Sequence, residues 1–395
     1  MFSHRLPDNL EPNEFSKVLA RKRAEGARLL DLTESNPTRA GIPYPKEEIL
    51  AALADAKALT YEPTPRGLLT AREAVAKYYA DRGQTVHPDQ ILLTASTSEA
   101  YAYLFKLFAD PGESFLVPSP SYPLFDMLAG LEDVALVPYP LHYRASRGWR
   151  LDTDAFEGAI GPSARGVILV NPNNPTGSCL RRGEWVAVRQ AASRNDLAVV
   201  CDEVFSDYLW DEALTDPDVV RSIAGDDSTL SFSLSGLSKV CGLPQLKLGW
   251  IVVNGPAQAR AEAMRRLELI ADTYLSVSAP VQHAAVRLLA LRSPIQAAIC
   301  QRLRENRTQL GGLRLGPELD PILRSDGGWY AVLQLGDVED ERVVLDWLNR
   351  LDIVLHPGYF FGFDDRQCVV VSLLTPMGAL GLAIKRILES PADDL

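Results

Sequence analysis

Residues 231–250 read SFSLSGLSKVCGLPQLKLGW, and the interpretation of the whole chain starts from this stretch. A short apolar run leads into a turn rich in serine and glycine that holds Lys239, and Lys247 follows eight residues later. Only nine of the 40 lysines and arginines are lysines, and none but these two lies between Lys106 and Lys385. A lysine removed from water has a lowered pKa and becomes a nucleophile that forms Schiff bases. The alternative is an ordinary solvated surface charge.

The composition is that of a soluble globular protein long enough for two or three domains. Of the 395 residues, 47% are hydrophobic and 23% are charged, and the net charge is −11. This acidic balance argues against broad binding to nucleic acid or anionic membranes. The five cysteines include no C-x-x-C pair, which indicates reduced thiols rather than disulfides or a zinc site. With no signal peptide and no membrane-spanning run in the sequence, we expect a cytoplasmic protein.

Seven short apolar runs alternate with amphipathic runs and predict one large sheet. They are ILLT (91–94), SFLV (114–117), VALV (134–137), GVILV (166–170), LAVVCD (197–202), TLSFSL (229–234) and GWIVV (249–253). Because most of them look buried on both faces, we expect an α/β fold with a mainly parallel, seven-stranded sheet and helices on both sides. A smaller α+β unit follows residue 256. We assign residues 46–275 to a large domain, and residues 1–45 and 276–395 to a small domain with an N-terminal arm.

Polar groups follow these runs, at the strand ends where open α/β sheets bind their ligands. Ser96, Thr97 and Ser98 come after the first run and before a helical stretch, which predicts an anion site at a helix N-terminus. An ordinary helix cap is the alternative, since a cap needs only one such residue. Tyr122 follows the second run, between prolines, and can offer a flat face to a ring.

Three later runs end in an amide, a carboxylate and the lysine. NPNNPTG (171–177) predicts a fixed turn in which Asn173 and Asn174 can donate hydrogen bonds. Asp202 ends a buried strand, where a carboxylate is costly unless it faces a cation. An anion cradle, an aromatic plate, an amide, a carboxylate and a lysine together fit pyridoxal phosphate. This cofactor has a phosphate, a ring, a phenolic oxygen, a pyridine nitrogen and an aldehyde.

With these residues, the sequence resembles the class I/II aminotransferases, the aspartate-aminotransferase-like branch of the fold-type I enzymes that depend on pyridoxal phosphate. The resemblance covers nearly the whole chain, and its most specific segments are NNPTG (173–177), DEV (202–204) and SGLSK-x7-K-x-GW (235–250). GGWY (327–330) and HPGYFFG (356–362) resemble the family's small-domain strand and its following loop. The resemblance implies the cofactor pyridoxal 5'-phosphate and a homodimer with shared active sites.

The resemblance also implies a role for each matching residue. Lys239 would carry the cofactor as an aldimine and move the proton at the substrate Cα. Asp202 would pair with the pyridinium nitrogen, Asn174 would bond the phenolic oxygen, and Tyr122 would stack on the ring. The remaining residues are Ser96, Thr97, Ser98 and Lys247 at the phosphate, Tyr61 at the phosphate of the neighbouring subunit, and Asn36 near the substrate.

Two cofactor-binding positions depart from the family's usual pattern. Lys247 stands where arginine is usual, so a point charge would replace a bidentate fork at the phosphate. Phe205 stands where a tyrosine usually gives the phenolic oxygen a second hydrogen bond. We therefore expect Asn174 to be the main partner of that oxygen, and the pKa of the aldimine to be raised.

A third departure concerns the substrate. Val370 stands where the family usually has an arginine that binds the substrate α-carboxylate, and a valine cannot do so. Arg366, four residues earlier, does not fit the register. Either Arg39 or Arg66 from the N-terminal half replaces the missing cation, or the substrate lacks this contact.

The expected activity is transamination between an amino acid, or an amine, and a 2-oxo acid. The same site would also serve a carbon–sulfur β-lyase that depends on pyridoxal phosphate, and the formation of ammonia and pyruvate without an oxo-acid acceptor would identify it. A non-catalytic sensor fused to a DNA-binding head is disfavoured, because the aminotransferase-like pattern starts within the first few dozen residues and the charge does not suit DNA. The presence of Lys239, Asp202 and Asn174 argues against an inactive member.

Overall fold

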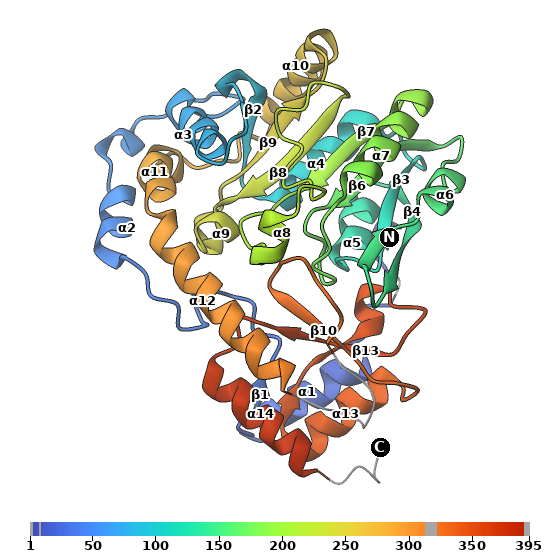
Figure 1. Ribbon diagram of the computed structural model, residues 1–395. Coiled ribbons are helices and arrows are strands. Elements are labelled where there is room, and N and C mark those ends of the chain that lie inside the picture. Colours follow the sequence, from blue (N-terminus) through green and yellow to red (C-terminus); the bar gives the residue numbers. More distant parts are fainter. Residues whose placement is uncertain (1–2, 8, 313–321, 391–395) are drawn as a thin grey trace.

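A sheet of eight strands dominates the computed structural model, which describes residues 3–7, 9–312 and 322–390 (Figure 1). The strand order is β2-β9-β8-β7-β6-β3-β4-β5. The strands are β2 (Ile91–Thr94), β3 (Ser114–Ser119), β4 (Ala135–Arg144), β5 (Gly148–Leu151), β6 (Ala164–Val170), β7 (Ala198–Asp202), β8 (Ser231–Gly236) and β9 (Gly249–Asn254). Neighbours from β8 to β4 pair in parallel, whereas β9 runs antiparallel to both β8 and β2.

The expectation of seven strands was wrong by one, because a hairpin adds β5 to the edge of the sheet. All seven apolar runs form strands, and β5 pairs antiparallel with β4. The missed strand has only four residues, GWRL, and no apolar run marks it in the sequence. Its Trp149 is nevertheless buried, so tertiary packing and not local pattern determines this strand.

Helices cover both faces of the sheet, as the continuous burial of its central strands requires. In β7, Ala198 and Val200 pack in the core formed with α4, α5 and α10, whereas Val199 and Cys201 pack in the core formed with α6 and α7. The helices of this unit are α2 (Lys46–Leu53), α3 (Leu69–Ala80), α4 (Thr97–Phe108), α5 (Leu124–Leu131), α6 (Thr153–Gly158), α7 (Arg182–Asn195), α8 (Asp211–Thr215), α9 (Leu237–Val240), α10 (Ala257–Tyr274) and α11 (Ala279–Ala290). Short 3-10 helices η1 (Ala56–Leu59), η2 (Pro88–Gln90) and η3 (Pro244–Leu246) complete it.

The turn between β8 and β9 reverses the chain at the carboxyl end of the parallel strands. Residues 237–248 form only α9 and η3 there, so β9 returns beside β8 in the opposite direction. A side chain on Gly236 would meet the carbonyl oxygen of Leu248 at 2.8 Å, which explains glycine at the start of this turn. The same turn carries Lys239, so the reversal places the lysine at the mouth of the sheet.

The smaller unit combines the two ends of the chain, as Figure 1 shows in its lower part. Its strands are β1 (Leu30–Asp31), β10 (Tyr330–Gln334), β11 (Ile353–Val354), β12 (His356–Pro357) and β13 (Cys368–Ser372), and its helices are α1 (Glu14–Ala24), α12 (Arg292–Gly311), α13 (Asp340–Leu351), η4 (Gly358–Phe361) and α14 (Met377–Glu389). β13 lies between β10 and β12, and β1 pairs in parallel with β11. Phe15 and Val18 of α1 share one core with α13 and β13.

The division of the chain at residue 275 remains a proposal, and the packing favours a later boundary. Val281, Ala284 and Leu288 of α11 lie in the same core as α2 and α3. We therefore place the end of the large domain after α11. None of the helices in the described part of the chain has the length and apolar character needed to cross a membrane.

Candidate active site

A cavity of about 260 Å³ opens where β6, β7 and β8 end, between the large sheet and β10. Eight of the predicted site residues line it: Ser96, Thr97, Ser98, Tyr122, Asn174, Asp202, Lys239 and Lys247. They come from five separate strand ends that are far apart in the sequence. The structure thus brings the residues that follow these strand ends together around one cavity.

Lys239 is partly buried in a largely aromatic environment. Its Nζ lies 4.8 Å from the ring centroid of Trp329 and 5.5 Å from that of Phe205. Burial lowers the pKa of Lys239 from 10.5 to about 8, and the neighbouring Asp202 opposes this change. Among the described residues, the amine has no hydrogen-bond partner. A larger share of this lysine is therefore neutral and nucleophilic near pH 7 than for a lysine in water.

Asp202 is the carboxylate that faces this lysine. It ends β7 and accepts hydrogen bonds from the Tyr101 hydroxyl at 3.2 Å and from the Val204 backbone N–H at 3.1 Å. Burial raises the pKa of Asp202 to about 6, while these two donors and Lys239 work against the increase. Near neutral pH the group is therefore largely a carboxylate, able to hold a protonated ring nitrogen.

The two asparagines of the NPNNPTG turn have different tasks. Asn173 stabilises the turn, since its amide donates to the carbonyl of Pro120 at 3.0 Å and to the hydroxyl of Thr176 at 2.9 Å. Asn174 lines the cavity, and its buried side-chain oxygen has no partner among the described residues. Such an atom is costly in a folded protein, and among the described residues that line the cavity only Asn174 has one.

The start of α4 serves as a capped helix end and as a cradle for an anion. Ser96 is the N-cap, and its hydroxyl accepts from the Glu99 backbone N–H at 3.1 Å, as the alternative interpretation required. Thr97 and Ser98 begin the helix, so their backbone N–H groups lack acceptors within it. The helix N-terminus and these groups together favour an anion.

Gly249 keeps this cradle open. It begins β9 beside the start of α4, and a side chain there would lie 3.0 Å from the Ser96 carbonyl carbon and 3.2 Å from the Thr97 nitrogen. Such contacts are too close for the backbone to stay in place. The glycine of the K-x-GW segment is thus explained by the close approach of β9 to the anion cradle.

Lys247 lies at the edge of the cavity in an unusual conformation. It follows η3 with a φ angle of +53°, in the left-handed region that residues other than glycine seldom adopt. Its side chain is exposed and borders the cavity. Strained backbone of this kind is concentrated at functional sites, where it directs a side chain toward a ligand.

Several residues in the cavity or beside Lys239 received no role from the sequence. Trp329 and Tyr330 follow two glycines, and that GGWY segment was recognised only as a strand. Tyr330 lines the cavity, and burial raises its pKa to about 12 while a hydrogen bond with Ser35 opposes the increase. Ser35 also lines the cavity, one residue before the predicted Asn36. In the sequence, the two consecutive aromatic residues after the glycines are the signal by which Trp329 and Tyr330 could have been identified.

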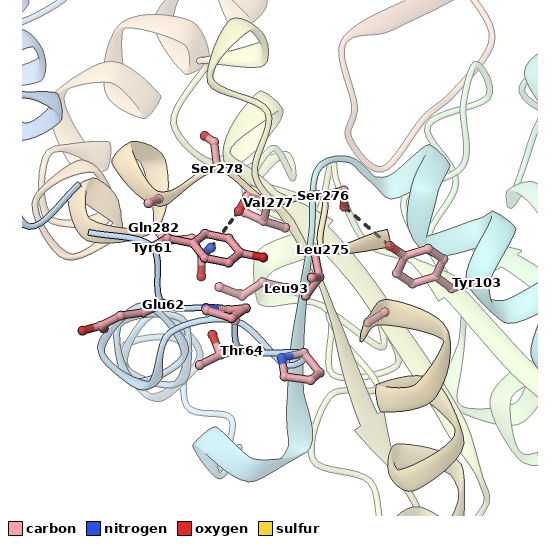
Figure 2. A pocket seen from close by; sticks show the side chains of 15 residues that line it. Tyr61, Glu62, Thr64, Leu93, Tyr103, Leu275, Ser276, Val277, Ser278 and Gln282 are labelled. Carbon is pink, nitrogen blue, oxygen red and sulfur yellow. Dashed lines mark hydrogen bonds between the residues drawn. The ribbon is translucent and has the colours of Figure 1, made fainter. Parts of the chain in front are cut away.

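The three remaining predicted residues lie outside the cavity in this chain. Tyr61 is 78% exposed and borders a separate groove of about 240 Å³, shown in Figure 2. The side chain of Asn36 accepts hydrogen bonds from the backbone and hydroxyl of Thr38, which hold a local turn. Arg39 is exposed at the surface next to this turn.

No arginine lines the cavity within the described part of the chain. Arg66 pairs with Glu268 instead. Arg366 pairs with Asp365 and lies over the rings of Tyr143 and Trp149. Val370 is buried in β13 opposite Val332 and His356, as its apolar side chain requires.

The sheet order, the buried lysine at the end of β8 and the carboxylate at the end of β7 define a fold-type I enzyme of the pyridoxal-phosphate class. The sequence profile described as "Aminotransferase class I and II" matches residues 27–378. The chain therefore belongs to the class I and II aminotransferases, enzymes that depend on pyridoxal phosphate, and it is a transaminase.

Relatives and solved structures agree with this assignment. The chain is 27% identical to the glutamate-pyruvate aminotransferase AlaA of Escherichia coli K12, over 88% of this chain and 86% of the relative. It is 28% identical to an alanine aminotransferase of Mycobacterium tuberculosis H37Rv, over 93% of this chain and 86% of the relative. An aminotransferase structure from Escherichia coli has a TM-score of 0.83 at 25% identity, covering 98% of this chain and 96% of that one. The alanine aminotransferase structure from Pyrococcus furiosus shares the fold, with a TM-score of 0.84 at 22% identity over 99% and 100% of the two chains.

Proposed function

We propose that Lys239 is the catalytic lysine of a transaminase that moves an amino group between an amino acid, or an amine, and a 2-oxo acid. The observation that carries this proposal is a partly buried lysine with no hydrogen-bond partner among the described residues and a pKa near 8, facing Asp202 in one cavity. When bound, pyridoxal phosphate supplies an aldehyde that condenses with amines and a ring that withdraws electrons from the substrate Cα. The donor set of the cavity, which includes the amide nitrogen of Asn174, fits this group.

Lys239 and the residues around it have different roles, each set by the chemistry of its side chain. Lys239 would take the proton from the substrate Cα, because burial keeps a larger share of its amine neutral than in water. Asp202 keeps the ring nitrogen protonated through a charge-assisted hydrogen bond. Asn174 donates to the phenolic oxygen, and Phe205 has no group that could do the same. Tyr122 provides the flat face on which the ring stacks.

The phosphate belongs at the start of α4. Thr97 and Ser98 contribute backbone N–H groups and hydroxyls, whereas the Ser96 hydroxyl is already used in capping. Lys247, which lines the same cavity, adds a positive charge. A lysine neutralises the phosphate as a point charge but does not fix its orientation as an arginine fork does.

The substrate end of the cavity involves the N-terminal segment. The hydroxyl of Ser372 donates to the Glu34 carbonyl at 2.7 Å, which keeps this segment beside the cavity. We assign Asn36 and Arg39, which follow directly, to substrate binding. Arg39 is then the cation that binds the substrate α-carboxylate, which Val370 cannot bind.

A second copy of the chain is the proposed partner. Large apolar side chains lie exposed along η1, α10 and α11, among them Leu59, Tyr61, Leu269, Tyr274 and Val286. A homodimer would cover them and bring Tyr61 to the phosphate of the neighbouring subunit. Light scattering should give twice the chain mass, and a monomer at micromolar concentration would contradict the shared site. We also propose a cytoplasmic location, in keeping with five free cysteines and an acidic charge.

The covalent link to the cofactor provides the first test. The purified protein should be yellow, and borohydride reduction should fix pyridoxal phosphate on the peptide that contains Lys239. Lys239→Ala should abolish this link. Lys106→Ala is the control, since Lys106 is paired with Glu132 outside the cavity. A link that survives in Lys239→Ala would refute the assignment.

Half-reaction spectroscopy should then identify the amino donor and the oxo-acid acceptor. The names of the relatives suggest alanine, glutamate and pyruvate as the first compounds to test. Ammonia and pyruvate formed without an acceptor would instead indicate β-lyase chemistry.

A further inference from the structure

The segment that leads into β10 is fastened to the turn that follows β6. Backbone N–H groups of Asp326 and Gly327 both donate to the Gly177 carbonyl, at 2.8 and 3.0 Å. Gly328 donates to the carbonyl of Tyr208 at 2.8 Å, and Trp210 donates to that of Asp326 at 2.9 Å. Residues far apart in the sequence thus form one continuous backbone contact between the two units.

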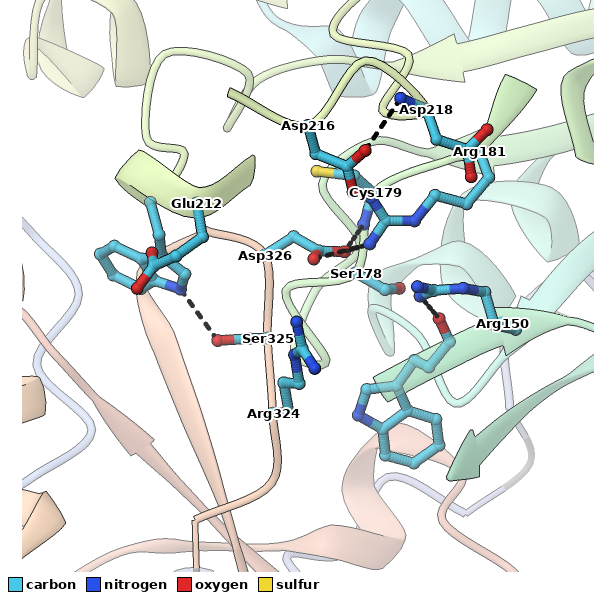
Figure 3. A network of polar contacts seen from close by, with 12 residues as sticks. Arg150, Ser178, Cys179, Arg181, Glu212, Asp216, Asp218, Arg324, Ser325 and Asp326 are labelled. Atoms are coloured by element: carbon cyan, nitrogen blue, oxygen red, sulfur yellow. Dashed lines mark hydrogen bonds and ion pairs between the residues drawn. The ribbon is translucent and has the colours of Figure 1, made fainter. Parts of the chain in front are cut away.

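A buried ion pair lies at the centre of this contact, as Figure 3 shows. Arg181 donates to both carboxylate oxygens of Asp326, at 2.7 and 2.9 Å, and the Cys179 backbone N–H donates to the same carboxylate at 2.9 Å. The side chains of Arg181 and Asp326 are only 8% and 14% exposed. Both bonds to Asp326 come from Nη2, while Nη1 donates to Asp216 at 3.1 Å. Charge-assisted bonds of this kind are strong, and loss of one partner leaves the other buried without compensation.

Glycines allow the two backbones to approach this closely. A side chain on Gly177, whose φ is +65°, would lie 2.2 Å from the Gly327 carbonyl oxygen. One on Gly327 would lie 2.4 Å from the Tyr208 carbonyl oxygen. The position of the segment is therefore set by backbone contact, which leaves little freedom for the residues that follow.

Trp329, two residues after Gly327, covers the catalytic lysine. Its ring is fully buried, packs against Phe205 and Tyr208 at centroid distances of 5.4 and 5.1 Å, and lies 4.8 Å from Lys239 Nζ. The Tyr208 hydroxyl donates to the Lys239 carbonyl at 2.6 Å. The fastened segment thus determines how close an aromatic ring stands to the reacting amine.

We propose that Arg181 and Asp326 are positioning residues for transamination, because their ion pair holds Trp329 over Lys239. Neither residue touches the cavity, so they act through the segment 326–329 and not on the substrate. The proposal rests on the proposed role of Lys239.

A specific consequence separates this role from general stabilisation. Burial lowers the pKa of Lys239, so a displaced Trp329 should admit water and return that pKa toward its ordinary value. Asp202 is the charged group whose interaction with Lys239 also affects its pKa, and the variants below leave it unchanged. The charged groups around the ion pair are Asp216, Arg150, Glu184 and Arg324.

The experiment measures this pKa in the full-length protein freed of cofactor. The chain is labelled with acetic anhydride over a range of pH, and mass spectrometry quantifies the peptide that contains Lys239. Asp326→Asn, which keeps the shape but removes the charge, should raise the midpoint by about one pH unit. Arg181→Lys keeps the charge but has one nitrogen in place of the two that bond Asp326 and Asp216, so it should give a smaller increase. It carries the same test if the asparagine variant does not fold.

Arg182→Gln is the matched control, because Arg182 is the next residue and is exposed. Thermal unfolding establishes that each variant is folded. If folded Asp326→Asn and Arg181→Lys both label with the midpoint of the unaltered protein, the proposal is overturned and the pair only stabilises the fold. A midpoint near 10.5 in the unaltered protein would instead refute the proposed activation of Lys239 itself.

Discussion

Asp202 ends β7, and Lys239 follows the end of β8, the strand that pairs with β7, so the two charges meet in one cavity. Each side chain carries a displaced pKa because of burial, about 6 for the carboxyl and about 8 for the amine. Burial of these two charges lowers the stability of the folded protein, and it also shifts their pKa values toward neutral pH. This combination is typical of active sites.

Replacement of the lysine should stabilise the protein in the absence of cofactor. The pKa of Lys239 is lowered in the folded state, so its protonation favours unfolding, and this cost disappears as the pH rises from about 8 to 10.5. Lys239→Met should therefore increase the free energy of unfolding at pH 7 by up to about 3 kcal/mol. Urea unfolding at pH 7 and pH 10 measures it, and an equal gain at both values would contradict the explanation.

Lys247 should contribute affinity for the phosphate alone. Lys247→Met should raise the dissociation constant of pyridoxal phosphate about tenfold, which corresponds to about 1.4 kcal/mol. Lys247→Arg should lower it by supplying the bidentate fork. Pyridoxal, which lacks the phosphate, is the control ligand. Titrations in which both ligands weaken alike would place Lys247 elsewhere in the site.

Gly249→Ala should damage the anion cradle. The added methyl group would lie 3.0 Å from the Ser96 carbonyl carbon, so the start of α4 has to shift. We expect at least a tenfold loss of affinity for pyridoxal phosphate, about 1.4 kcal/mol, with the protein still folded. Gly183→Ala is the control, because Gly183 lies in α7 with open space around it. Unchanged affinity in Gly249→Ala would show that the start of α4 does not bind the phosphate.

Phe205→Tyr should restore a second donor near the phenolic oxygen of the cofactor. The Phe205 ring stands 5.5 Å from Lys239 Nζ at the cavity wall. An added donor stabilises the charged oxygen, so the spectroscopic pKa of the bound cofactor should fall by about one unit. Phe360→Tyr, outside this cavity, should leave it unchanged. A pKa that stays constant in Phe205→Tyr would mean that the new hydroxyl does not reach the oxygen.

The sequence identified the large sheet and most of the candidate site because both depend on local signals. Apolar runs marked seven strands, and polar residues at their ends marked eight side chains that share the cavity. Only the family resemblance separated Asn174 from Asn173, since the folded turn determines which amide forms internal hydrogen bonds. Trp329 was missed because its importance comes from contact with Lys239, a residue 90 positions away in the sequence.

The pairing of β1 with β11 has a consequence for the order in which the protein is made. Leu30 lies opposite Ile353, and Phe15 packs in the same core as β13. During synthesis the apolar side chains of the first segment therefore remain exposed until nearly the whole chain has left the ribosome. The large sheet, whose strands lie between residues 91 and 254, can form well before that moment.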